Sequence, residues 1–225
     1  MKFSYEYTHE RDVESAYILR LSNNKISQEL SARCKYSCDK IGMPAKYWEA
    51  FDGTNKTDVI IPEHLKNQSH IHWLKVHKTD ISSAQIAIIL SHYSLWCRCI
   101  ELDKPIVIFE HDAVMVKPFL KFGFYNMIQF LGCVEQVRGT LPIYKLPPHA
   151  SWYEGRLRFI CRAHAYAIDP QVAKNLVSHI IKVGIITTAD VFMRSDLFGI
   201  IQDDVYAYDL AGETTNFEMQ NSINS

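Results

Sequence analysis

Apolar and polar residues along the chain first predict a strand, a helix and a second strand. Residues 15–21 form a short apolar strand, apolar side chains recur at helical spacing through 26–38, and 47–51 form the second strand. Gly42 and Pro44 end the helix, because glycine accepts a left-handed cap and proline lacks the N–H that a helix needs. Strand, helix and strand in this order form the unit from which parallel sheets are built.

The helix with the clearest signals begins after Ser82. Ser82 and Gln85 form an S-x-x-Q capping box, and apolar residues recur at helical spacing through 86–100. Pro105 then opens a continuous apolar run at 106–109, which is typical of a strand buried on both faces of a sheet. This run is the predicted central strand.

The last third of the chain adds a strand, a helix and a strand. Residues 158–168 alternate with the period of two that strands show. Asp169 and Pro170 start a helix as its N-cap and first residue, and Gly184 ends it. Residues 203–210 are the last predicted strand. The whole order predicts a single α/β, Rossmann-like sandwich with a mixed, mainly parallel sheet.

Three stretches carry no clear period. Residues 54–79 are expected to cross the surface irregularly, 118–132 to form a packed helix or loop, and 140–153 to form a flexible proline-rich loop. We expect one catalytic domain over residues 1–210 and a polar C-terminal tail over 211–225 that frays.

The composition excludes several classes of protein. The chain has 225 residues, 48% of them hydrophobic and 22% charged, so it can form a folded core. A net charge of −1 provides no general attraction for nucleic acid or an anionic membrane. The N-terminus lacks the apolar segment of a secretory signal, and no apolar run approaches the ~20 residues of a membrane span. None of the six cysteines forms a C-x-x-C pair, which predicts reduced thiols in a cytoplasmic protein.

Candidate chemistry begins where the strand at 106–109 ends. Glu110 and Asp112 place two carboxylates on either side of His111. Ligands of open α/β sheets bind outside the carboxyl ends of such strands. Hard oxygen ligands at this place suit a Mg²⁺ or Mn²⁺ ion that bridges a diphosphate. The alternative is an ordinary solvated strand end.

Four blocks of sequence follow one another in a characteristic order. They are Tyr17-Ile18-Leu19-Arg20-Leu21; Ala50-Phe51-Asp52-Gly53; residues 83–96, which end in Ser91-His92-Tyr93-Ser94-Leu95-Trp96 and precede residues 108–112; and residues 163–168 with Asp190 further on. In this order they resemble glycosyltransferase family 25, which includes lipooligosaccharide-type sugar transferases and collagen galactosyltransferases. The resemblance spans about residues 16–210.

The resemblance implies a GT-A-like fold that binds a nucleotide sugar. It implies metal-dependent, inverting transfer of a hexose onto a glycan or lipooligosaccharide-type acceptor, with UDP-galactose as the expected donor. The implied cofactor is Mn²⁺ or Mg²⁺. We expect the enzyme to meet its acceptor from the cytoplasm, with peripheral attachment at the inner membrane face left open. The sequence does not define an oligomeric state.

The resemblance also implies roles for the metal-binding and catalytic residues. Asp112 is the expected inner-sphere metal ligand, and Glu110 contacts the metal or the ribose. His164 completes the metal shell or touches phosphate, or is a half-buried polar residue of its strand. Asp190 is the expected general base, which removes the proton of the acceptor hydroxyl. Its alternative role is to cap a short helical segment at 191–197.

The donor is expected to contact a further set of residues. His92 and Gln85 share one stripe of their helix, so both are placed in the donor pocket together with Glu110. Asp52 and Gly53 are expected to hold the edge of the nucleotide. A buried histidine that orients the acidic strand and an ordinary Asp-Gly turn are the respective alternatives.

The chain departs from the family pattern at several positions. Arg20 and Ser22 stand where the family has Asn and Asp, Gln85 lies in a block that is Gly-Glu-Ile-Gly in the family, and His111 replaces a middle acid. These departures support one alternative, a catalytically degenerate module that binds nucleotide or glycan. A metal-dependent phosphoesterase that uses residues 110–112 is the second alternative, although the dense Asp and His spacings of such sites are missing from this sequence.

Overall fold

The structure is a computed structural model that describes residues 13, 15–55, 58–67, 74–76, 81–119, 127–132, 163–194, 197–201 and 204–209. The predicted proline-rich loop at 140–153, the first part of the predicted strand at 158–168 and the polar tail lie outside these residues.

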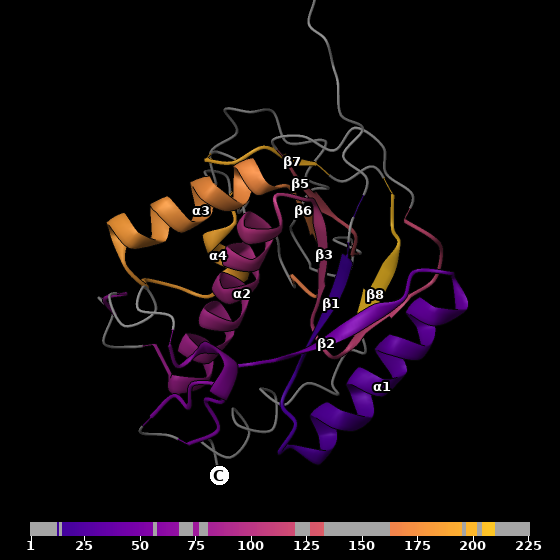
Figure 1. Cartoon of the computed structure of the whole chain (residues 1–225), viewed down its shortest axis with the longest axis horizontal. Coiled ribbons are helices and arrows are strands. Elements are labelled where there is room, and N and C mark those ends of the chain that lie inside the picture. Colours follow the sequence, from indigo (N-terminus) through magenta and orange to yellow (C-terminus); the bar gives the residue numbers. More distant parts are fainter. Residues whose placement is uncertain are drawn as a thin grey trace, which may run out of the picture.

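A six-stranded mixed sheet forms the centre of the fold (Figure 1). Its order is β2-β1-β3-β6-β5-β7. The strands are β1 (Ser15–Arg20), β2 (Ala45–Glu49), β3 (Ile106–Phe109), β5 (Ile128–Phe130), β6 (Ala165–Ile168) and β7 (Ile200–Ile201). The pairs β1–β2, β1–β3 and β5–β7 are parallel, whereas β6 pairs antiparallel with both β3 and β5. The prediction of an α/β fold with a mixed sheet is therefore confirmed.

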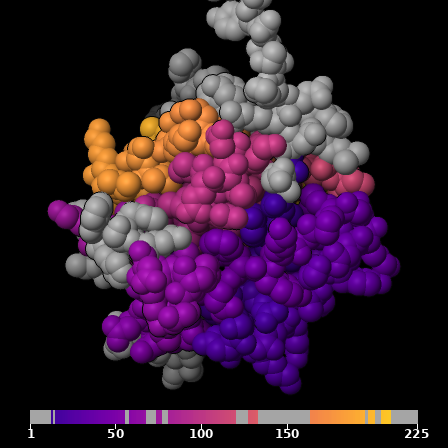
Figure 2. Space-filling model, viewed as in Figure 1, coloured from indigo at the N-terminus to yellow at the C-terminus, as the bar shows by residue number. Residues whose placement is uncertain are grey.

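Helices cover both faces of this sheet. They are α1 (Lys25–Lys40), α2 (Ser83–Leu102), α3 (Pro170–Val183) and α4 (Ala189–Phe192), with a short 3₁₀ turn at Glu63–Leu65. Figure 1 shows α1 on one side of the sheet and α2, α3 and α4 on the other. A second, two-stranded sheet of β4 (Ala113–Met115) and β8 (Ala207–Asp209) lies on the side of α1. In the space-filling view of Figure 2, α2 is exposed between α3 and the N-terminal elements.

Alternation along the strands produces a separate core on each face of the sheet. In β1, Tyr17 and Leu19 pack with residues of α2, while Ala16 and Ile18 pack with residues of α1. The same alternation holds in β3 and β6, because successive side chains of a strand point to opposite faces. Burial on both faces explains why the 106–109 run is continuously apolar.

The predicted helix ends are confirmed where local chemistry determines them. Ser82 and Gln85 form the full capping box of α2. The Asp169 side chain accepts hydrogen bonds from the first backbone N–H groups of α3, which ends at Gly184. The four described cysteines (Cys34, Cys38, Cys97 and Cys99) are free thiols. None of the helices described is both long and apolar enough to span a bilayer.

Several predicted elements differ from the structure, including the strand expected at 203–210, of which only 207–209 form β8 among the described residues. The prediction of a helix or loop for 118–132 is wrong at 128–130, which forms β5. Strand β2 begins at Ala45 and ends before Phe51. The helical segment expected at 191–197 is α4, so Asp190 lies inside its first turn. All these elements are short, and tertiary pairing rather than a sequence period defines their limits.

Candidate active site

A cavity of about 160 Å³ lies at the carboxyl ends of β1 and β3. The chain places β2 on one side of β1 and then β3 on the other, so the strand order changes direction between β1 and β3. Open α/β sheets bind their ligands at such switch points. The described residues that line the cavity are Leu19, Arg20, Leu21, Ala50, Phe51, Gly53, Thr54, Ala84, Ala87, Ile88, Ser91, His92, Glu110, His111 and Asp112.

The acidic end of β3 forms one wall of the cavity. Both acidic residues of the sequence motif, Glu110 and Asp112, line it. Asp112 is buried, whereas the Glu110 side chain is 33% exposed. The backbone N–H of Glu110 donates to the carbonyl of His164 at 2.8 Å, which ties this turn to the residue before β6. The structure therefore places both acidic residues of the motif at one wall.

His92 of α2 controls the state of Glu110. Its Nε2 lies 3.2 Å from Oε1 of Glu110. Burial acts to raise the pKa of Glu110, but the hydrogen bond from His92 lowers it, and the net pKa lies below the ordinary value. Glu110 is therefore an anion at neutral pH and accepts hydrogen bonds or binds a cation.

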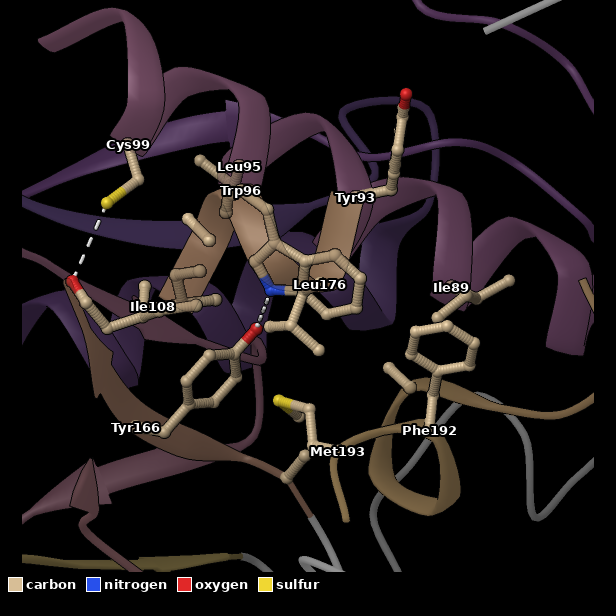
Figure 3. Close-up of a cluster of buried hydrophobic side chains, with 14 of the residues drawn as sticks. Ile89, Tyr93, Leu95, Trp96, Cys99, Ile108, Tyr166, Leu176, Phe192 and Met193 are labelled. Carbon is tan, nitrogen blue, oxygen red and sulfur yellow. Dashed lines mark hydrogen bonds between the residues drawn. The ribbon is translucent and has the colours of Figure 1, made fainter. Parts of the chain in front are cut away.

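His92 also connects the cavity to the core behind it. Its Nδ1 lies 2.8 Å from the hydroxyl of Tyr166 on β6, and the indole N–H of Trp96 donates to the same hydroxyl at 2.9 Å. Figure 3 shows the Trp96–Tyr166 bond inside the packed cluster between α2 and the sheet. His92 therefore lines the pocket, as expected, and is also a buried residue that contacts the acidic end of β3, as its alternative role required.

His111 sits between the cavity and the first turn of α1. Its Nδ1 lies 3.2 Å from the hydroxyl of Ser27. Burial lowers the pKa of His111 below its ordinary value, although the charge of Glu110 opposes this. A neutral imidazole thus replaces the middle acid at this wall.

The turn after β2 brings Gly53 rather than Asp52 to the cavity. The Asp52 carboxylate accepts hydrogen bonds from the Asn23 amide at 2.8 Å and from the backbone N–H of Thr54 at 2.9 Å. Burial would raise the pKa of Asp52, but bonds from Thr54 and Asn23 hold it below the ordinary value. This arrangement favours the turn role of Asp52, and a contact to nucleotide remains a prediction for Gly53.

Gly53 packs directly on the first turn of α2. A Cβ at this position would lie 2.4 Å from the carbonyl oxygen of Ser83 and 2.6 Å from the Cα of Ala84. Only glycine allows this approach, because both neighbours are backbone atoms.

Gln85 caps α2 and does not line the cavity. Its side-chain oxygen accepts a hydrogen bond from the Ser82 backbone N–H at 3.0 Å. The cavity instead faces the neighbouring stripe of α2, where Ala84, Ala87 and Ser91 provide a surface of small side chains.

His164 lies behind the cavity wall. Its ring is buried and packs edge-on against Phe130, with centroids 5.8 Å apart. A Cβ on Gly132 would lie 2.4 Å from this ring, so the glycine makes room for it. His164 is near enough for its charge to lower the pKa of Glu110. Its part in metal binding remains a prediction.

Asp190 lies in the first turn of α4, close enough to Glu110 and His92 for their charges to act on its carboxyl. Its Oδ1 accepts hydrogen bonds from the Thr188 hydroxyl and, at 2.9 Å, from the backbone N–H of Val191. Burial raises the pKa of Asp190 above the ordinary value, and the charge of Glu110 raises it further. Thr188 occupies the N-cap position of α4 and makes no side-chain capping bond, whereas Asp190 accepts a backbone N–H of the first turn. The capping role and the catalytic role of Asp190 both stay predictions.

Among the residues that the structure brings into the site, Arg20, Tyr166 and Trp96 had no role assigned from sequence. Arg20 lines the cavity, and its guanidinium lies 4.5 Å from the centroid of the Tyr47 ring. Tyr166 and Trp96 support His92. The one available signal was the spacing of His92 and Trp96, which are one helical turn apart and so share a face.

The donor set fits a divalent ion that arrives with a diphosphate. In the part of the chain that the structure describes, no three His, Cys, Asp or Glu side chains converge on a common metal position. Mg²⁺ is commonly held by one or two carboxylates, while substrate phosphates and water complete its shell. Glu110 and Asp112 supply that pair of carboxylates on one wall.

Comparison with known protein families gives a match. The sequence profile of glycosyltransferase family 25 (LPS biosynthesis protein) matches residues 15–131. This stretch runs from β1 past β5 and contains every described residue of the cavity wall. His164, Tyr166 and Asp190 lie beyond it. No curated protein matches the chain.

Proposed function

This chain belongs to glycosyltransferase family 25 and is a glycosyltransferase, and we propose that its cavity binds a UDP-linked hexose and transfers the hexose to a glycan or lipooligosaccharide-type acceptor. UDP-galactose is the donor we place first. The observation that carries the proposal is the cavity at the switch point between β1 and β3, with the acidic residues Glu110 and Asp112 on one wall.

The sheet supports a GT-A-like reading of the fold. In the six-stranded sheet β6 runs against the direction shared by the other strands. The residues before β6 therefore meet the residues after β3 at the same edge. A nucleotide sugar bound at this edge would lie between the acidic turn of β3 and the small-residue stripe of α2.

The donor is held by surfaces of different chemistry. The small side chains of Ala84 and Ala87 would let a flat base and ribose approach α2 closely. Arg20 provides positive charge for phosphate oxygens on the same cavity wall.

Glu110 and Asp112 would hold Mn²⁺ or Mg²⁺ together with the diphosphate. Such an ion supplies positive charge that stabilises the departing diphosphate. The protein's own task here is to present two ionised oxygens and to keep them oriented, which His92 does for Glu110.

Asp190 would act as the general base of an inverting reaction. The acceptor oxygen forms a bond to the anomeric carbon of the hexose, the bond from that carbon to the diphosphate breaks, and the hydroxyl proton passes to Asp190. Both described hydrogen bonds of the carboxylate fall on Oδ1, and its raised pKa suits a base that works nearer neutral pH.

A thermal-shift screen tests the donor assignment. UDP, GDP and CMP sugars are added to the protein with and without Mn²⁺, since a ligand that binds only the native state raises the melting temperature. At 100 times Kd the stabilisation is about 2.7 kcal/mol, or roughly 5–10 °C for a chain of this size. We expect the shift for UDP-hexose with Mn²⁺. A shift with another nucleotide would replace the donor, and none with any pair would contradict the proposal.

The departures from the family pattern at Arg20, Gln85 and His111 support one second candidate, a module that binds nucleotide or glycan without transfer. Binding of UDP with Mn²⁺ but no turnover across a range of acceptors would identify it.

A further inference from the structure

Four side chains from three elements form one hydrogen-bonded chain that ends at the cavity. Trp96 of α2 donates to the Tyr166 hydroxyl of β6 at 2.9 Å. The same hydroxyl lies 2.8 Å from Nδ1 of His92, whose Nε2 lies 3.2 Å from Glu110. Trp96, Tyr166 and His92 are fully buried. Such a chain contains no water-exposed link before it reaches Glu110.

The chemistry of the groups fixes the direction of this chain. An indole N–H can only donate, so the Tyr166 oxygen accepts from Trp96. The hydroxyl hydrogen of Tyr166 then needs an acceptor, and Nδ1 of His92 is at the right distance. A neutral imidazole carries one N–H, which is therefore on Nε2 and donates to the carboxylate of Glu110.

The other two forms of His92 leave a group unsatisfied. In the imidazolium form Nδ1–H would donate to Tyr166, so the hydroxyl hydrogen of Tyr166 would lose His92 as its acceptor. A buried donor without an acceptor is costly. In the Nδ1–H tautomer a bare Nε2 would face an oxygen of ionised Glu110, so two acceptors would meet.

We propose that Tyr166 and Trp96 are positioning residues of the transfer reaction, which fix His92 as its Nε2–H tautomer and thereby hold the Glu110 carboxylate at the cavity wall. The geometry also explains the spacing of the motif on α2. His92 and Trp96 are four residues apart, so they share one face and reach the same hydroxyl. The effect on catalysis rests on the proposed function, whereas the tautomer is a property of the folded chain alone.

Nitrogen NMR of the histidines tests the proposal directly. Protonated and bare ring nitrogens have well-separated ¹⁵N shifts, and the signals absent from a His92→Gln spectrum identify His92. In the ¹⁵N-histidine-labelled wild type, without added ligand, we expect Nε2 protonated and Nδ1 bare. An imidazolium or an Nδ1–H tautomer at neutral pH would overturn the proposal.

The Tyr166→Phe variant tests the positioning role. It removes the hydrogen that Nδ1 accepts, so we expect the ¹⁵N signals of His92 to shift toward a mixture of tautomers. Loss of such a supporting partner typically costs 10–100-fold, which we expect in kcat/KM for UDP-galactose with Mn²⁺, mainly through a higher donor KM. Unchanged His92 signals together with unchanged kinetics would contradict the proposal.

Tyr93→Phe is the matched control. Tyr93 is also fully buried on α2, and Figure 3 shows its hydroxyl pointing away from the Trp96–Tyr166 pair. This variant should leave the His92 signals and the donor KM unchanged. An equal change in both variants would reveal a general packing effect and overturn the assignment. If the protein transfers no hexose from UDP-galactose, the proposed function fails while the tautomer measurement still decides the inference.

Discussion

At the scale of single residues, the fold moves the pKa values of two carboxyls in opposite directions. Burial raises the pKa of Asp190, and the charge of Glu110 adds to this. Burial also acts to raise the pKa of Glu110, but the hydrogen bond from His92 brings it below the ordinary value. Environments that separate two carboxyls in this way assign them different roles. Glu110 stays a fixed anion, and Asp190 can take up a proton.

The Asp190→Asn variant tests the base. It should bind donor normally and lose about 10²–10⁴-fold in kcat, the usual contribution of general base catalysis. In the wild type, kcat should fall as pH drops through the raised pKa of Asp190, because only the ionised carboxylate accepts the proton. Asp103→Asn is the control, since Asp103 is an exposed carboxylate at the far end of α2. Normal transfer by Asp190→Asn would remove this residue from the base role.

Asp52 has a structural role that depends on pH. Its pKa is lowered in the folded state, so its charge stabilises the fold above the ordinary value near 3.8, and this contribution is lost as pH falls through the lowered pKa. We expect Asp52→Asn to cost about 1–3 kcal/mol at pH 7, because the bond from the Asn23 amide loses its acceptor.

Urea unfolding of both proteins over a pH series measures this effect. The difference in unfolding free energy between wild type and Asp52→Asn should shrink as the wild-type carboxyl becomes protonated. A difference that stays constant with pH would show that the charge of Asp52 contributes nothing.

At the scale of elements, α2 holds the parts of the cavity in place. The hydroxyl of Ser91 accepts a hydrogen bond from the backbone N–H of Phe51 at 2.9 Å, which fixes the turn after β2. Ser94 accepts from the indole N–H of Trp48 on β2, also at 2.9 Å. One turn of the same helix presents His92 to the acidic end of β3. The polar residues of this motif thus connect α2 to β2 and to the end of β3.

Gly53→Ala tests the contact between this helix and the turn after β2. The added Cβ meets backbone atoms of α2 at 2.4 Å and 2.6 Å, so the turn must move. We expect a loss of about 1–3 kcal/mol in the free energy of unfolding and weaker nucleotide binding.

Gly42→Ala is the matched control. Its φ of 75° strains the added side chain as well, but no atom lies within 4 Å and the position is remote from the cavity wall. The Gly42→Ala variant should lower stability and leave nucleotide affinity unchanged. If both variants bind nucleotide with the same affinity, the packing of Gly53 on α2 does not support nucleotide binding.

Elements could be predicted where neighbouring residues determine them. The capping box of Ser82 and the start of α3 at Asp169 and Pro170 are local chemistry, and the sequence located them correctly. Strand β5 has three residues and no period, and it exists because it pairs with β6 and β7. Such a strand cannot be found from local pattern alone.

At the scale of the whole molecule, the reversed strand β6 determines what meets at the site. Phe109 at the end of β3 pairs with Ala165 at the start of β6, because the two strands are antiparallel. This brings His164 beside Glu110 and Tyr166 behind His92. A parallel β6 would have carried these residues to the opposite edge of the sheet.

This strand arrangement also explains which residues of the site could be predicted from the sequence. Glu110 and Asp112 were predicted at the cavity because they follow a buried strand. Asp52 and Gln85 were expected there too, but local hydrogen bonds occupy their side chains. The role of Tyr166 could not be predicted, since it depends on a partner 74 residues earlier in the chain.

The central claim is that the acidic end of β3 binds a divalent ion and a nucleotide together. Isothermal titration of UDP into wild type and Asp112→Asn, each with Mn²⁺ and with EDTA, tests it most directly. We expect UDP to bind wild type only with Mn²⁺, and the variant to bind at least about 100-fold more weakly with a nearly unchanged melting temperature. Losing a metal ligand should exceed the 10–100-fold cost of losing an outer partner. Equal UDP affinity in both proteins, or a large loss of stability with nucleotide binding intact, would contradict the account.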